Sequence, residues 1–252
     1  MNLAQTLRTH LRITGAVTRR VLTQLRHDPA TVALLLVVPP MLVALLRYVF
    51  DSPRTFDLVG PALLGTFPFL VMFMVASITT LRERTLGTLE RLMTLPMARI
   101  DLLAGYAIAF GVMAVAQVAV TATVALTWLG LDVAGSLGML LLVATLAALL
   151  GMALGLFISA FARTEFQTMQ FMPAVVAPQL LLCGLFTPRD EMATALRAIS
   201  DGFPLSNVVD ALNLVTASTE VTGELVRDLV IVAAYTLLAL AMGATTLRRR
   251  AA

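Results

Sequence analysis

Six long apolar runs constrain the fold of this chain more than any other feature. A transmembrane helix needs about 20 mostly apolar residues. The runs are residues 30–46, 58–81, 102–129, 137–162, 169–186 and 225–247. Pro39 and Pro40 interrupt the first run, and Pro173 and Pro178 interrupt the fifth, so kinks or partial re-entry are expected there. The sequence therefore predicts an all-α integral membrane protein, with residues 1–252 forming one transmembrane domain.

The composition agrees with a lipid environment. The chain is 59% hydrophobic and only 13% charged, whereas soluble domains are about half apolar and about a quarter charged. A net charge of +3 could attract nucleic acid, but the basic residues stand at the ends of apolar runs and not in a patch with aromatic residues. We therefore expect contact with membrane lipid and no nucleic-acid partner. The first apolar run follows a polar stretch too long for a signal-peptide n-region, so it is expected to remain as a span.

The distribution of arginine predicts how the chain is oriented. All 18 basic residues are arginine, and placing both termini inside assigns 13 of them to inner segments and 5 to outer segments. Segments rich in basic residues stay on the cytoplasmic side of a membrane. The expected protein is thus a multi-pass protein of the inner or plasma membrane, with six spans and both termini in the cytoplasm.

Residues 3–28 are expected to form an amphipathic helix before the first span. At 100° per residue one side of this helix is apolar. That side carries Leu3, Leu7, Leu11, Val21, Leu22 and Leu25. Another side carries Arg8, Arg12, Arg19 and Arg26. Such a helix lies in the inner interface with its arginines on anionic headgroups; the alternative is a solvated basic tail.

Two further segments have helical spacing but are too short or too polar to span. Residues 82–96 are the most polar inner stretch, with apolar residues at helical spacing and Pro96 as a stop, which predicts a short cytoplasmic helix. Residues 187–224 contain two short apolar-periodic pieces separated by Asp201-Gly202-Phe203-Pro204. Backbone that enters the membrane without spanning it must be buried in protein or line water. We therefore expect a pair of helices dipping into the outer leaflet over an exit path, with an interfacial hairpin as the alternative.

The sequence contains no motif that predicts an enzyme. No His adjoins a nucleophile or a metal-ligand cluster, and Cys183 is the only cysteine. A phosphate-binding loop needs a lysine to reach the phosphates, and this sequence has none. We expect no catalytic residues, metal or cofactor in this chain. If transport is driven by ATP, a partner ATPase must bind the ATP and Mg²⁺.

The polar residues in the interiors of the six apolar runs are uncharged. Ion-coupled carriers keep ionisable groups at membrane depth, and the interiors of the six runs lack them, which disfavours such a carrier. Several polar and aromatic side chains are instead candidates for a path that suits an amphipathic cargo, although each of them could simply pack. They are Phe69, Phe73, Gln117, Thr121, Gln170 and Gln179. The sequence Gly151-Met152-Ala153-Leu154-Gly155 is typical of a close helix contact.

Three pieces of the chain together resemble a known family. They are Glu83-Arg84-Thr85-Leu86-Gly87-Thr88-Leu89-Glu90 with Leu95-Pro96, Gly184-Leu185-Phe186-Thr187-Pro188 with Met192, and Phe203-Pro204-Leu205-Ser206 with Asp210-Ala211-Leu212. Over nearly its whole length the chain resembles the permease subunits of type-2 ABC exporters (the ABC-2 type), which include daunorubicin-resistance, polysaccharide and Nod-factor export permeases. It departs from them at Asp201-Gly202-Phe203, where a bulky or Asn-containing run is more usual.

The resemblance implies a role for each piece. The first would be the coupling helix that sits in a groove of the ATPase, through Glu83, Gly87, Thr88, Glu90 and Arg91. The other two would frame the outer re-entrant helices, with Phe186, Pro188 and Pro204 at an outer gate, and residues 3–28 would be an interfacial connecting helix. The chain would pair with a second permease subunit, identical or not, and with an ABC ATPase subunit.

The function implied is export of an amphipathic drug-, lipid- or glycan-like molecule by alternating access. The alternatives are an ion-coupled secondary carrier and a membrane scaffold that transports nothing.

Overall fold

The computed structural model describes residues 3–87 and 98–249, and within these ranges the secondary structure is helical, without strands. The elements in chain order are α1 (Leu3–Arg26), α2 (Pro29–Phe50), α3 (Pro53–Thr85), α5 (Arg99–Thr123), a π-helical turn η1 (Val124–Trp128), α6 (Leu137–Ser159), α7 (Glu165–Leu182), a 3₁₀ turn η2 (Arg189–Glu191), α8 (Thr194–Asp201), α9 (Pro204–Ala217) and α10 (Gly223–Arg249). The predicted all-α fold is confirmed.

Five helices in the described ranges are long and apolar enough to cross a membrane, namely α2, α3, α5 with η1, α6 and α10. Helix α2 runs without a break through Pro39 and Pro40, so the first predicted span is one continuous helix. The fifth predicted span, residues 169–186, corresponds to the 18-residue α7, which contains Pro173 and Pro178 and is not among the five. A sixth span therefore remains a prediction.

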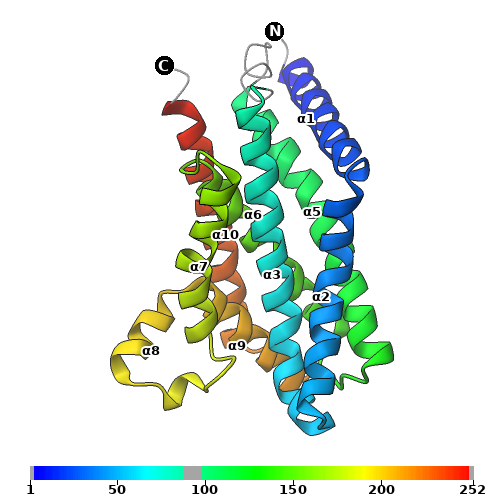
Figure 1. Ribbon diagram of the computed structural model, residues 1–252, viewed down its shortest axis with the longest axis vertical. Helices are drawn as coiled ribbons and strands as arrows, with labels where there is room; N and C mark the ends of the chain where they lie inside the picture. The colour runs from blue at the N-terminus through cyan, green and yellow to red at the C-terminus, as the bar shows by residue number, and fades with distance from the viewer. Residues whose placement is uncertain (1–2, 88–97, 250–252) are drawn as a thin grey trace.

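The long helices lie side by side, and the chain ends on the side from which it starts (Figure 1). The N-terminus, the C-terminus and the last turn of α3 lie at one end of the molecule, which we name the terminal end. Helices α8 and α9 lie at the opposite end, the distal end. The two short helices predicted within residues 187–224 are present, as α8 and α9.

Local capping sets where α2 and α3 begin. The Asp28 side chain accepts a hydrogen bond from the Thr31 N–H at 3.1 Å, and Pro29 follows in the first turn of α2. Ser52 caps α3 in the same manner, with Pro53 after it. A side-chain oxygen at the cap and a proline in the first turn, which needs no N–H, both favour helix initiation. Helix α3 consequently starts five residues before the predicted span at residue 58.

Helix α1 packs on protein with part of its apolar side. Val17, Val21 and Leu25 are buried in a cluster with residues of α5 and α3, and Val17 lies directly over Gly105. Leu11, on the same predicted apolar side, is 70% exposed. The basic stripe of Arg8, Arg12, Arg19 and Arg26 is exposed. Helix α1 thus packs against the other helices on one side and exposes these four arginines on another.

Helices α3 and α6 make the closest contact in the bundle. A Cβ atom built on Gly151 would collide with the carbonyl oxygen of Phe69, and one built on Gly155 would collide with that of Phe73. The two glycines, one turn apart, therefore let the α3 backbone approach α6 closely. The predicted helix-contact motif is confirmed.

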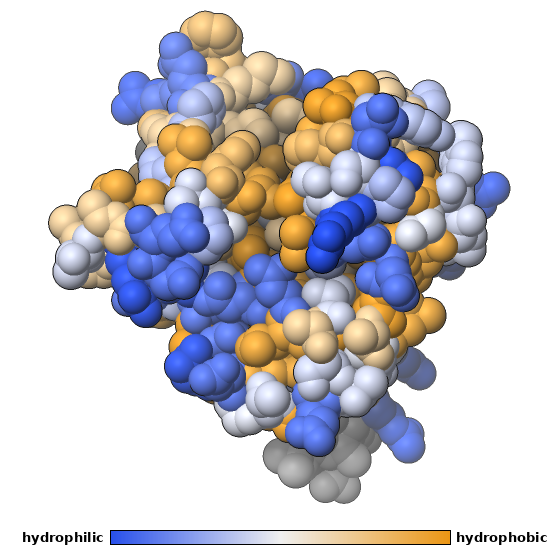
Figure 2. Space-filling model, turned by 90° about the horizontal axis from the view of Figure 1, so that it is seen from below, coloured by the Kyte–Doolittle hydropathy of each residue, from blue (hydrophilic) through white to orange (hydrophobic). Residues whose placement is uncertain are grey.

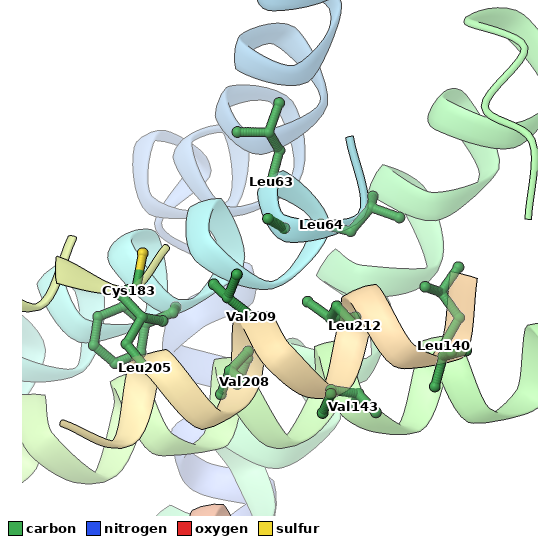
Figure 3. Packing of buried hydrophobic residues seen from close by; sticks show 14 of the residues in the cluster. Leu63, Leu64, Leu140, Val143, Cys183, Leu205, Val208, Val209 and Leu212 are labelled. Carbon is green, nitrogen blue, oxygen red and sulfur yellow. The ribbon is translucent and has the colours of Figure 1, made fainter. Parts of the chain in front are cut away.

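Helix α9 packs into the distal part of the core. Its buried residues Leu205, Val208, Val209 and Leu212 lie between Leu63 and Leu64 of α3, Leu140 and Val143 of α6, and Cys183, which are among the residues of one hydrophobic cluster (Figure 3). A Cβ on Gly65 of α3 would stand 2.6 Å from Leu212 Cδ1. A short helix that cannot span is thus held by side-chain packing on spanning helices.

Candidate functional site

The end of α3 is the first candidate site, because the predicted coupling helix starts there. Arg82 to Thr85 form the last turn of α3 and not the first turn of a separate helix. The Leu86 N–H donates to the Arg82 carbonyl at 3.0 Å, and the Gly87 N–H donates to the Arg84 carbonyl at 3.1 Å. Gly87 has a φ of 67°, the left-handed conformation that ends many helices.

Most of the predicted coupling helix lies outside the described residues. Thr88, Glu90 and Arg91 belong to residues 88–97, so their role stays a prediction. Gly87 lies on the described side of this boundary, and a Cβ added to it would meet nothing within 4 Å. Among the described residues Gly87 makes no close contact, and its role there is to form the turn.

Glu83 faces the inside of the molecule. It is only 6% exposed, and its carboxylate lies 3.6 Å from the Arg20 guanidinium of α1. In this subunit it therefore links α3 to α1, whereas the sequence suggested a side chain directed toward a partner.

Ion pairs and hydrogen bonds tie five helices together at the terminal end. Arg82 at the end of α3 binds Glu165 of α7 through two hydrogen bonds, of 2.6 and 3.2 Å. This pairing lowers the pKa of the Glu165 carboxyl. Arg84 donates to the backbone carbonyls of Ser159 and Ala160, which end α6. His10 of α1 lies 2.8 Å from the Asp101 carboxylate of α5, so a displacement at this end would reach α1, α5, α6 and α7 as well as α3.

The predicted path residues occupy different surroundings. Phe69 and Phe73 are wholly buried in the cluster that contains α9. Gln117 and Thr121 of α5 are also wholly buried, and the Thr121 hydroxyl donates to the Gln117 carbonyl at 2.8 Å. Neither polar atom of the Gln117 side chain has a hydrogen-bond partner within the described part of the chain.

Two path residues lie on α7. The Gln179 amide is buried and donates to the Val175 carbonyl at 3.1 Å, while Gln170 is exposed. With Phe69 inside the core and Gln170 at the surface, the six residues do not all face one space in this subunit. Their role in a path stays a prediction.

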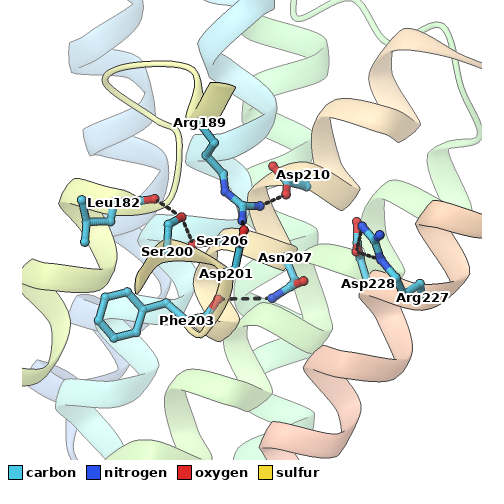
Figure 4. A network of polar contacts seen from close by, with 10 residues as sticks. All are labelled: Leu182, Arg189, Ser200, Asp201, Phe203, Ser206, Asn207, Asp210, Arg227 and Asp228. Atoms are coloured by element: carbon cyan, nitrogen blue, oxygen red, sulfur yellow. Dashed lines mark hydrogen bonds and ion pairs between the residues drawn. The ribbon is translucent and has the colours of Figure 1, made fainter. Parts of the chain in front are cut away.

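A polar network joins the short helices at the distal end (Figure 4). Arg189, just before α8, pairs with Asp201 at the end of α8 and with Asp210 of α9. The Ser200 hydroxyl donates to the Leu182 carbonyl at 2.6 Å and lies 3.0 Å from the Ser206 hydroxyl. Burial raises the pKa of the Asp210 carboxyl although Arg189 opposes the shift. The network fixes α8 and α9 to the end of α7.

An open hollow of about 760 Å³ lies beside this network. Its wall combines the predicted gate residues Phe186 and Pro188 with Arg189, Asp201 and Asp210. Phe186 is 66% exposed, whereas the third gate residue, Pro204, is buried in the first turn of α9. Viewed from the distal end, the surface mixes polar and apolar side chains over its whole width (Figure 2). The wall of the hollow thus places charged groups of both signs beside an exposed aromatic ring.

Sequence reasoning missed the charged residues that organise the two ends. It counted Arg189 and Asp228 only among the outer charges, and Asp210 only among these charges and in a segment that resembles the family. The structure places Asp228 in α10, completely buried and 3.0 Å from the Arg227 guanidinium. The apolar periodicity of α10 begins at Leu225, so the position of Asp228 within a helix, next to Arg227, could have been inferred, but its complete burial could not.

The comparisons with known proteins agree with this architecture. A family model for the ABC-2 type transporter matches residues 13–216. The chain is 24% identical over 181 residues to the probable multidrug ABC transporter permease YbhR of Escherichia coli. These aligned residues make up 71% of this chain and 49% of YbhR. It is 24% identical over 146 residues to ABC transporter G family member 20 of Dictyostelium discoideum, covering 57% of this chain and 20% of that protein. The matches thus span half or less of the length of these relatives.

The family match covers most of the chain, including α2, α3, α5, α6 and α9. The helices that match are also those that form the described core and four of the five helices able to cross a membrane. The chain is therefore a multi-pass membrane protein that belongs to the ABC-2 type transporter family.

Proposed function

We propose that this chain is the permease subunit of an ATP-driven exporter, in which a separate ATPase supplies the energy and a second permease subunit completes the pore. The observation that carries the proposal is the position of the end of α3. Helix α3 stops at a left-handed glycine directly before residues 88–97, at the end of the molecule where five helices are joined by polar contacts. A partner that moves this segment would act on all five helices.

The packing of α3 supports a mechanical connection to the distal end. Helix α3 is mostly buried along its length and lies against α6 through Gly151 and Gly155. Near its other end it contacts α9 where Gly65 meets Leu212. Coupling between distant sites needs a contiguous and rigid set of contacts, and α3 is one helix that reaches from the terminal end to α9.

The cargo that fits best is amphipathic. The distal hollow offers charged groups of both signs beside Phe186 and Leu185, and alternating access would release the cargo there. The proposed orientation places the terminal end in the cytoplasm of a cell whose inner or plasma membrane holds the protein, since 13 of 18 arginines then lie inside. YbhR carries "multidrug" in its name, which is compatible with such a cargo.

The purified chain, reconstituted in lipid vesicles, is expected to hydrolyse no ATP by itself, because its sequence has no lysine for a P-loop. Adding a P-loop ATPase encoded in a neighbouring reading frame should give ATP-dependent movement of an amphipathic dye. The control is the same ATPase with its P-loop lysine replaced. Hydrolysis by the chain alone, or dye movement driven by a proton gradient without ATP, would contradict the proposal and favour a carrier.

The orientation is tested by single cysteines in a Cys183→Ala background. Ala16 of α1 is exposed at the terminal end, and Thr219, after α9, is exposed at the distal end. A membrane-impermeant maleimide applied to intact cells should label Thr219→Cys and should label Ala16→Cys only after permeabilisation. The reverse pattern would invert the proposed orientation.

A further inference from the structure

A small pocket at the terminal end has no role in the proposed transport. It lies between α3, α5, α6 and α10, and its walls are mostly aliphatic. The room that it leaves for the centres of water-sized groups is about 30 Å³, and all of its empty space, with the open mouth included, is about 470 Å³. The residues that line it include Thr80, Arg84, Leu102, Tyr106, Leu156 and Leu240.

Two hydroxyl groups in this pocket have no partner. Thr80 is 8% exposed and Tyr106 is 3% exposed. The Thr80 Oγ1 and Tyr106 Oη atoms are buried and make no hydrogen bond to any described residue. Native proteins rarely leave buried polar atoms unsatisfied, because such an atom has lost its hydrogen bonds to water without gaining others. Two such atoms at one pocket therefore indicate that the pocket binds a polar group.

The charge of the pocket indicates an anion. Arg84 lines it, and its hydrogen bonds to the Ser159 and Ala160 carbonyls hold the guanidinium at the wall. Among the described residues that line the pocket none is acidic, and Arg84 is the basic one. An anionic group between the two hydroxyls would therefore be attracted to Arg84 and would accept hydrogen bonds from both hydroxyls.

We propose that this pocket binds the carboxylate of a single-chain lipid, a long-chain fatty acid. The Thr80 and Tyr106 hydroxyls would donate to the carboxylate beside Arg84, and the acyl chain would leave through the open mouth past Leu102 and Leu240. The room for the centres of water-sized groups, about 30 Å³, accommodates about two of them, which suits the two oxygens of a carboxylate. A phosphodiester is too bulky for it. The site needs only the membrane setting and does not depend on what the protein exports.

The test uses the full chain in nanodiscs of neutral phosphatidylcholine with a photoreactive fatty acid that carries a diazirine in its chain. Labelling is expected on α5 and α10, and palmitate should compete for it while hexadecanol should not. The variant Thr80→Val with Tyr106→Phe should bind about tenfold more weakly or worse, since a hydrogen bond to a charged group commonly contributes that much. Tyr106→Phe alone, which keeps the shape of the ring, should show part of the loss.

Tyr235→Phe is the matched control, because the Tyr235 hydroxyl donates to the Gly202 carbonyl at 2.9 Å at the distal end. It should leave fatty-acid labelling unchanged. Equal competition by hexadecanol would show that the carboxylate is not recognised. Labelling that persists in both Tyr106 variants, or competition by an anionic phospholipid but not by palmitate, would likewise overturn the proposal.

Discussion

Replacing both Gly151 and Gly155 with alanine should abolish most of the folded protein, and Gly151→Ala alone should lower its thermal stability sharply. A Cβ at either position would collide with a backbone carbonyl of α3, and a backbone atom cannot move aside as a flexible side chain can. Overpacking typically costs about 1–3 kcal/mol and occasionally more. Since the displacement would act along the whole α3–α6 contact, we expect the upper part of that range for each glycine. Fluorescence-detected size-exclusion chromatography after heating measures the loss.

Gly111→Ala is the matched control for this experiment. Gly111 also lies within a spanning helix, α5, but a Cβ there would stand 3.6 Å from Leu149 Cδ2, which is ordinary van der Waals contact. Alanine favours helix over glycine by about 1 kcal/mol at both positions, so the difference between the variants isolates the packing. Equal melting of Gly111→Ala and Gly151→Ala would mean that α3 and α6 do not meet at Gly151.

The sequence predicted those parts of the fold that follow from local patterns. The apolar runs located α2, α3, α5, α6 and α10 within a few residues, because burial in lipid demands long stretches without charge. The motif from Gly151 to Gly155 identified a close contact, although its partner, the backbone at Phe69 and Phe73, was not predictable from a run that is apolar on every side.

Boundaries and partners were less predictable for physical reasons. Helix α3 continues through Arg82 to Thr85, because charged residues that favour helix extend it beyond the apolar run that the membrane requires. Glu83 appeared to be an outward charge, but its partner Arg20 lies 63 positions earlier in the chain, on a helix whose packing the sequence does not fix. Arg189 likewise meets Asp210 only in the folded protein, and a single sequence read by itself carries no signal of such a pair.

The coupling proposal predicts a distinct effect for Gly87. Its left-handed φ of 67° is accessible to glycine, tolerable for asparagine and strained for leucine. A strain of about 1–2 kcal/mol for a residue such as leucine corresponds to a loss of roughly 5- to 30-fold in the population of the turn. We therefore expect Gly87→Leu to reduce association with the ATPase by about that factor, measured by titration of the ATPase onto the full chain in nanodiscs.

The variant Gly87→Asn distinguishes a requirement for the turn from a direct contact between Gly87 and the ATPase. A Cβ at Gly87 meets nothing within 4 Å in the described part of the chain, so the asparagine variant retains the turn while it adds a side chain toward any partner. If Gly87 serves only the turn, asparagine should restore most of the association that leucine loses. If Gly87 touches the ATPase, both variants should fail equally. Normal association in the leucine variant would remove this turn from the coupling element altogether.

The ion pair between Glu83 and Arg20 allows a second, independent test of how a movement of the ATPase is transmitted to the helices of this chain. Because Glu83 is buried against α1, Glu83→Gln should act by loosening α1 from α3 and not by removing a contact with the ATPase. Arg20→Gln removes the other half of the pair, so both variants should bind the ATPase normally and should show the same partial loss of ATP-driven transport. Arg163→Ala, an exposed change between α6 and α7, is the control and should transport at the normal rate. If Glu83→Gln abolishes ATPase binding while Arg20→Gln leaves it intact, then Glu83 reaches the ATPase directly, and the link through α1 is wrong.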